Sequence, residues 1–252
     1  MDKDSKRHFV IGAVAASAGV FLGMAGVVAG AYGVYNRDQR NVIPDYLRTH
    51  AVKKLQIGAG GAGGGREFAG WLNTDIEPVA GEGYLDATKR FPVPDGALSY
   101  IFSEHLIEHL SYRDGSAMLR ESYRTLKQGG KVRIATPDLS RLVKLFQTSK
   151  TDEMRDYING KLGAAYWPET LPLTVSPECV ILNYELKSFG HRFVYDPQTL
   201  RESLQRAGFQ AIEEFAPGES DDPQLRGLEV RHASRDHAVN DYETMVFQAV
   251  RP

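Results

Sequence analysis

Short apolar runs, separated by turn-rich or helical stretches, recur along the chain from residue 52 onward. Four of these runs, at 55–57, 71–74, 98–102 and 132–135, have the length and content of short buried strands. Two more strands are expected near the C-terminus, at 211–215 and 244–250. Because the strands alternate with helices, the pattern predicts an α/β fold with a mostly parallel sheet.

The helical pattern is clearest over 113–128, where apolar residues recur at helical spacing and Gly129 and Gly130 provide a stop. Further helices are expected over 138–149, 152–162 and 197–207, the last of them ended by Gly208. The stretch 164–190 contains several prolines and little periodicity. A long irregular stretch inside a compact domain is usually functional, so we expect an insertion that covers the substrate site.

Residues 9–35 carry no formal charge and are long enough, as a helix, to cross a hydrocarbon core of about 30 Å. We expect a single transmembrane helix or uncleaved signal anchor, with a flank at 1–8 and a linker with a short helix at 36–51. Small residues lie four and three positions apart in alternation along one face of this helix. Such a face lets two helices approach closely, which predicts a homo-oligomer formed through Gly12, Ala16, Gly19, Gly23, Gly26, Gly30 and Gly33.

Two interpretations of this segment remain open. Three cationic residues precede it and five follow within about 20 residues, which favours a cytoplasmic C-terminal domain. The run from Ser5 to Val10 also resembles a twin-arginine export signal, with Lys6 in the first arginine position. The run Ala29–Ala31 resembles a signal-peptidase site, which favours export instead.

Composition excludes several classes of function. The 252 residues include 30 Lys plus Arg against 32 Asp plus Glu, so the basic excess typical of a nucleic-acid-binding protein is missing. A single cysteine, Cys179, excludes an intramolecular disulfide and a zinc site built from thiolates. Residues 52–252 are expected to form one domain.

A glycine-rich run, Gly58 to Gly63, follows the first predicted strand, and Asp75 follows the second. Glycines allow close approach of a ligand at the end of a parallel strand, and a strand-end carboxylate can accept hydrogen bonds from a ribose. Asp75 lies 17 residues beyond Gly58, closer than the roughly 20 of a dinucleotide fold. A nicotinamide cofactor is therefore the less favoured alternative.

Two Glu–His pairs follow the fourth strand in the run from Ser103 to Leu110. His105 and His109 have the i,i+4 spacing of a zinc-binding HExxH helix, but the intervening glutamate, Glu108, adjoins the second histidine instead of the first. With no third ligand evident, no metal is expected.

Taken in order, these motifs resemble the class I S-adenosylmethionine-dependent methyltransferases, especially their type 11-like branch. The resemblance covers about 52–250. The residues that carry it are Leu55–Gly60, Gly70–Asp75, Asp86, Phe91–Asp95, Ser103–His105 with Glu108 and His109, Leu119–Glu121, Leu126–Gly130, Arg133–Asp138, Gly190–Asp196, Leu200 and Ala207–Phe209.

The resemblance implies a Rossmann-like seven-stranded sheet with an antiparallel last strand and helices on both faces. It implies S-adenosylmethionine as cofactor, with Gly58 and Gly60 lining the methionyl part, Asp75 on the ribose and Asp86 near the adenine. The residues that would border the transferred methyl group are Ser103, Glu104 and His105.

Methyl transfer from a sulfonium needs an aligned nucleophile, and a base only where the nucleophile must lose a proton. His105 is the first candidate for that base, and its competitors are Glu104, His191, His109, Asp138 and Tyr195. The Asn/Asp-Pro-Pro-aromatic motif that marks methylation of base or glutamine amino groups does not follow the fourth strand. The chain also departs from the family pattern at two positions. Many class I methyltransferases have an acidic residue where this chain has Gln56, and the type 11-like branch often has Asp where it has Ser99.

These observations predict methyl transfer to a small-molecule, glycan or lipid-linked acceptor near the membrane, with no nucleic-acid partner. Two alternatives remain. One is a membrane-tethered nucleoside-binding scaffold without turnover, since a fold does not secure an activity. The other is an NAD-dependent oxidoreductase.

Overall fold

The computed structural model describes residues 41–60, 67–163, 176–229 and 237–252. Its centre is one seven-stranded sheet in the order β3-β2-β1-β4-β5-β7-β6. Strands β1 to β5 run parallel, and β7 is antiparallel to both of its neighbours, β5 and β6. The predicted seven-stranded α/β sheet with an antiparallel last strand is therefore confirmed. Its strands are β1 (Lys54–Ile57), β2 (Leu72–Asp75), β3 (Gly83–Tyr84), β4 (Leu98–Glu104), β5 (Leu126–Pro137), β6 (Gln210–Phe215) and β7 (Thr244–Val250).

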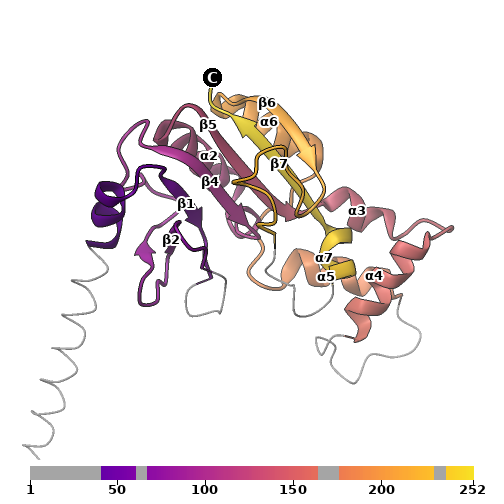
Figure 1. Ribbon diagram of the computed structural model, residues 1–252. Coiled ribbons are helices and arrows are strands. Elements are labelled where there is room, and N and C mark those ends of the chain that lie inside the picture. The colour runs from indigo at the N-terminus through magenta and orange to yellow at the C-terminus, as the bar shows by residue number, and fades with distance from the viewer. Residues whose placement is uncertain (1–40, 61–66, 164–175, 230–236) are drawn as a thin grey trace, which may run out of the picture.

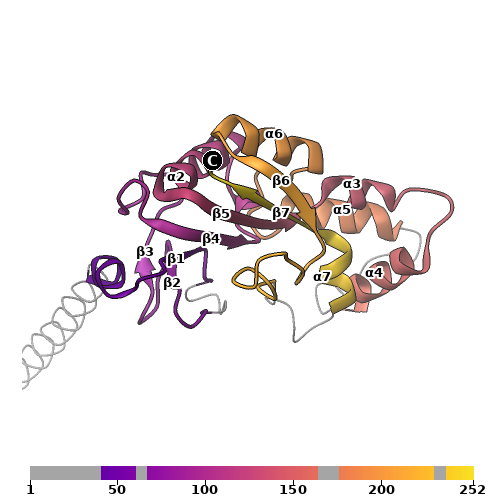
Figure 2. The same ribbon diagram turned by 45° about the horizontal axis from the view of Figure 1, so that its top comes forward.

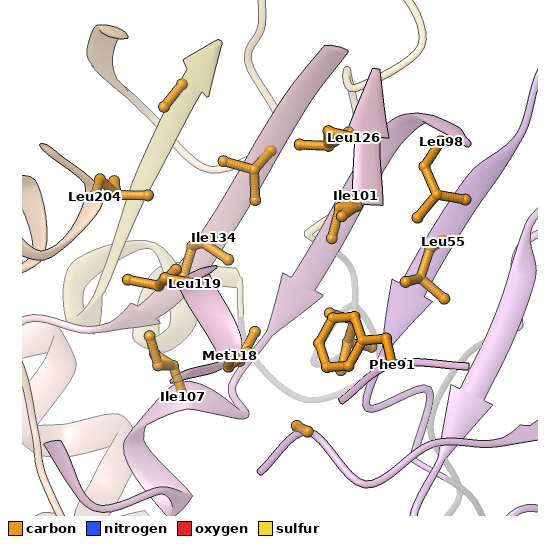
Figure 3. Close-up of a cluster of buried hydrophobic side chains, with 14 of the residues drawn as sticks. Leu55, Phe91, Leu98, Ile101, Ile107, Met118, Leu119, Leu126, Ile134 and Leu204 are labelled. Atoms are coloured by element: carbon orange, nitrogen blue, oxygen red, sulfur yellow. The ribbon is translucent and has the colours of Figure 1, made fainter. Parts of the chain in front are cut away.

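Two helices, α2 (Tyr112–Thr125) and α6 (Pro197–Ala207), cover one face of the sheet (Figure 2). The main hydrophobic core lies between them and the strands, and Figure 3 shows Leu119 and Leu204 of these helices near Ile134 of β5. These side chains are fully buried. The apolar residues whose spacing predicted α2 and α6 thus form the face of each helix that packs against the sheet.

The opposite face of the sheet is covered differently from what we expected. Trp71 and Phe102 on this face pack against Leu225 and Leu228, which belong to the connection between β6 and the next helix. The described part of that connection, 216–229, contains no helix. The prediction of helices on both faces is therefore wrong for this part of the described chain, because an irregular segment supplies the apolar side chains instead.

Four further helices gather at one end of the sheet, beside the carboxyl ends of β4 and β5 (Figures 1 and 2). They are α3 (Leu139–Lys144), α4 (Asp152–Gly163), α5 (Pro177–Lys187) and α7 (His237–Glu243). They share a second apolar cluster that includes Leu145, Tyr157, Ile181 and Tyr242. This helical group therefore lies on the side of the sheet where ligands bind in open α/β folds.

Several predicted boundaries change. Helix α2 ends at Thr125, and Gly129 and Gly130 belong to β5, because residues 126–131 pair with β4 and β7 instead of continuing the helix. The irregular stretch 164–190 contains α5, whose amino end has Ser176 as N-cap and Pro177 in the first turn. Residues 164–175 of that stretch lie outside the described residues.

The predicted short helix before the domain is present at 41–49. The hydroxyl of Tyr46 donates to the Gly70 carbonyl at 2.9 Å and accepts from the Lys54 amide at 2.9 Å, which ties this helix to the sheet. Within the described residues, no helix combines the length and the apolar character needed to span a membrane. The predicted span at 9–35 lies outside them.

Helix α6 offers a test of local sequence signals. Asp196 caps its amino end by accepting a hydrogen bond from the Thr199 amide at 2.7 Å, and Gly208 ends it with a left-handed φ of 107°. We expect Asp196→Ala to lower the free energy of unfolding by about 1 kcal/mol, the usual loss for an N-cap. Urea denaturation measures it, with the exposed Glu202→Ala as control. Equal stability of the two variants would contradict the capping role.

Candidate active site

The predicted cofactor residues lie at the carboxyl ends of four neighbouring parallel strands, β3, β2, β1 and β4. Ile57, the last residue of β1, pairs with Thr74 of β2 on one side and with Ser103 of β4 on the other. The strand order reverses at β1, and this switch point is where open α/β sheets bind their ligands. The candidate residues are Gly58 and Gly60 after β1, Asp75 at the end of β2, Asp86 after β3, and Ser103, Glu104 and His105 at the end of β4.

The chain turns sharply after β1. Gly58 and Gly60 have φ values of 76° and 102°, a region that favours glycine. A Cβ on Gly58 would lie 2.2 Å from Cδ1 of Leu106, so the missing side chain lets the turn pack against the segment that follows β4. Residues 61–66 of the glycine-rich run lie outside the described residues.

The amides of this turn are already used within the protein. Gly58 and Ala59 both donate to the Thr74 carbonyl at 2.9 Å, and Gly60 donates to Asp75 Oδ2 at 3.0 Å. The amides of these three residues are therefore not free to bind a ligand carboxylate. Gly58 and Gly60 instead allow the sharp turn that brings the Gly60 amide to Asp75.

Asp75 and Asp86 occupy equivalent places at the ends of adjacent strands. Asp75 Oδ1 accepts from the Glu77 amide at 2.9 Å, in addition to the bond from Gly60 to Oδ2. Each carboxylate oxygen has two lone pairs, so Asp75 keeps acceptor capacity for two further donors. Asp86 Oδ1 accepts from the amide and the hydroxyl of Thr88, at 2.9 and 2.7 Å.

Burial and backbone conformation differ among the three residues at the end of β4, Ser103, Glu104 and His105. Ser103 is buried within β4, and its Oγ has no hydrogen-bond partner among the described residues. Glu104, the last residue of the strand, is also buried. His105 follows with a φ of 46°, an uncommon value for a residue other than glycine, while its amide donates to the Ala135 carbonyl. The positive φ turns the chain out of the strand at this histidine.

The His105 ring lies between a hydroxyl and a carboxylate. Nε2 is 3.1 Å from Thr244 Oγ1, and Nδ1 is 3.2 Å from Oε1 of the fully buried Glu108. Burial disfavours the charged form of both groups, but their mutual attraction outweighs it. It raises the pKa of His105 and lowers the pKa of Glu108, which therefore stays ionised.

The other candidate bases have structural surroundings of their own. Asp138 caps α3, accepting from the amide and hydroxyl of Ser140 at 2.8 and 2.6 Å. Tyr195 is fully buried in the main core, and this burial raises the pKa of its hydroxyl well above the usual range. The suggestion that Tyr195 enters the site is therefore wrong, because its side chain packs beside Tyr112 and Phe193.

His191 lies against His109, with ring centroids 4.8 Å apart and the rings nearly perpendicular. Its Nδ1 contacts the carbonyl of Glu185 at the end of α5. His105, Glu108, His109 and His191 are thus neighbours, although His191 comes from a distant part of the chain.

Sequence reasoning missed Thr244 and Leu106, because a threonine opening a strand and a leucine in a turn carry no distinguishing signal.

Comparison with known families identifies the domain. A family model described as "Methyltransferase domain" matches residues 61–214, more than half of the chain. The chain belongs to this methyltransferase family. Membership confirms the resemblance to class I S-adenosylmethionine-dependent methyltransferases, and with it the predicted enzyme class and the predicted cofactor, S-adenosylmethionine.

No curated protein matches the methyltransferase. Among solved structures, a SAM-dependent methyltransferase from Archaeoglobus fulgidus is 16% identical, with a TM-score of 0.44, over 86% of this chain and 93% of that one. An S-adenosylmethionine-dependent methyltransferase from Mesorhizobium loti is 15% identical, with a TM-score of 0.45, over 79% and 91%. Phosphoethanolamine N-methyltransferase 2 from Haemonchus contortus, solved with S-adenosyl-L-methionine, is 17% identical, with a TM-score of 0.39, over 80% and 49%.

Proposed function

We propose that this methyltransferase binds S-adenosylmethionine at the carboxyl ends of β1 to β4 and methylates a small-molecule, glycan or lipid-linked acceptor near a membrane. The observation that carries the proposal is the convergence of Gly58, Gly60, Asp75 and Asp86 on three adjacent strand ends at the switch point of the sheet. The described residues fit the cofactor, because Asp75 keeps unused lone pairs there.

When bound, S-adenosylmethionine supplies an electrophilic methyl group. Asp75 would accept hydrogen bonds from the ribose hydroxyls, and Asp86 would lie beside the adenine. The methionyl part would lie along the turn after β1, whose shape depends on the positive φ values of Gly58 and Gly60. Ser103 and Glu104 would border the methyl group from the end of β4.

His105 is the residue we assign as proton acceptor for a hydroxyl acceptor. Glu108 faces its Nδ1 and orients the ring, so Nε2 is the nitrogen available to exchange its contact with Thr244 for an acceptor hydroxyl. Two further residues are candidates for this proton acceptor. Glu104 is next to His105 in the chain, and His191 lies near Glu108.

Two features support an acceptor associated with a membrane. The uncharged segment 9–35 has the length and composition of an anchor. Large apolar side chains are also exposed in α3 and just after α3 and α5, with Val143, Phe146 and Phe189 each 52% accessible. Apolar side chains displayed near a site are suited to a lipid-linked acceptor.

Calorimetry on the full chain in detergent tests the proposal. We expect S-adenosylmethionine and S-adenosylhomocysteine to bind with dissociation constants on the order of micromolar, about −8 kcal/mol. Radiolabelled methyl transfer into fractionated lipid and glycan extracts then identifies the acceptor. Binding of NAD in place of S-adenosylmethionine would support the oxidoreductase, and cofactor binding without transfer to any fraction would support the scaffold.

A further inference from the structure

Two segments far apart in the sequence meet beside the proposed site. One is the short 3-10 helix η2 (Ile107–His109), and the other is the stretch after α5 that contains His191. The amides of Arg192 and Phe193 both donate to the Glu108 carbonyl, at 2.7 and 3.1 Å. These main-chain bonds fix His191 next to Glu108 and His109.

The side chains of Glu108, His109 and His191 form a compact group of metal-ligating atoms. One ligand atom from each lies within 4.8 Å of the other two. A zinc ion holds imidazole nitrogens and carboxylate oxygens at about 2.0–2.2 Å, so its ligand atoms are roughly 3.3–3.6 Å apart. To reach this spacing, no separation within the group would have to shorten by more than about 1.5 Å.

The outer contacts of the group are those that orient metal ligands. His191 Nδ1 donates to the Glu185 carbonyl, so Nε2 carries the lone pair of the neutral ring. Glu108 Oε2 accepts from Thr136 Oγ1 at 3.0 Å, which fixes the carboxylate. Glu185, in turn, is held by Lys161 at 2.7 Å.

A buried oxygen is an independent sign of a ligand. Oε1 of Glu108 is inaccessible to solvent and makes no hydrogen bond, although His105 Nδ1 lies 3.2 Å away. The contact with His105 is an ion pair. A metal ion would give this buried oxygen a directly bonded partner in addition to the ion pair with His105.

We propose that Glu108, His109 and His191 bind a zinc ion, with one coordination position left open. Two histidines and one glutamate are a ligand set of catalytic zinc sites, whose open position accepts water or substrate. Resting on the proposed methyl transfer, we assign that position to an oxygen of the acceptor, which the ion would polarise. The proposal departs from the expectation of no metal, because His191 can supply the third ligand that the sequence did not show.

Metal binding is measured on the full chain without S-adenosylmethionine. After chelation and removal of the chelator, Zn²⁺ is titrated in competition with a chromophoric chelator, and Co²⁺ is used as a spectroscopic probe. We expect a single tight site and tetrahedral Co²⁺ bands. His191→Ala and His109→Ala should each weaken Zn²⁺ binding by more than about 100-fold, beyond the 10- to 100-fold typical of changes to outer contacts.

His50→Ala is the matched control, because His50 stacks on Tyr46 in the helix at 41–49 and is not part of the group. Circular dichroism confirms that each variant is folded, and Glu108→Gln replaces the charge with little change in shape. Equal Zn²⁺ affinity in wild type, His109→Ala and His191→Ala would overturn the proposal. If the wild-type protein binds Zn²⁺ but not S-adenosylmethionine, the result counts against the proposed function alone.

Discussion

Replacing Asp75 with alanine is expected to weaken binding of S-adenosylmethionine by about 100-fold. The carboxylate lies at the end of β2, and its two oxygens each accept one backbone hydrogen bond, from Gly60 and Glu77. The remaining lone pairs are the ones that a ribose would use. Hydrogen bonds to a charged group contribute about 1.5–3 kcal/mol each, so losing two of them removes at least a factor of 100.

The substitution also removes the support of the turn after β1, so a second variant separates the two effects. Asp75→Asn keeps one acceptor oxygen for the Gly60 amide but removes the charge, and we expect an intermediate loss of affinity. Asp152→Ala, at an exposed carboxylate of α4 that pairs with Arg155, is the control. Calorimetry of the folded variants measures the effect, and wild-type affinity in Asp75→Ala would refute the ribose assignment.

Elements with strong local signals were predicted well from the sequence. Helix α6 begins at Pro197 and ends at Ala207 as expected, because a cap, a proline and a terminal glycine mark its ends. Strand β7 likewise matches 244–250. In contrast, the two-residue strand β3 exists only through its pairing with β2, and helix α7 lacks a distinct apolar pattern.

The site residues also divide into those that local sequence could place and those that depend on contacts between distant segments. Residues at strand ends could be placed together from the sequence, since parallel strands end at one edge of a sheet. The contact of His191 with Glu108 could not, because main-chain bonds between segments about 80 residues apart create it. The use of the Gly58, Ala59 and Gly60 amides by Thr74 and Asp75 was hidden for the same reason, as it depends on the exact register of β1 and β2.

Replacing Glu229 with leucine is expected to lower the free energy of unfolding by about 3–5 kcal/mol. Glu229 and Arg133 form an ion pair in which both side chains have no exposed surface, with contacts of 2.6 and 2.9 Å. Arg133 lies in β5, on the face of the sheet covered by 216–229. Removing one partner leaves the other charge buried without compensation, which costs far more than the pair contributes.

The carboxylate of Glu229 also accepts from the Gly218 amide at 2.8 Å, so the pair anchors both ends of the segment that covers this face. We expect the double variant Arg133→Met with Glu229→Leu to recover most of the lost stability, because no buried charge remains. Urea denaturation of the three variants, Arg133→Met included, forms a double-mutant cycle. If the two single losses simply add in the double variant, the stability of this face depends on packing, and the ion pair itself contributes little.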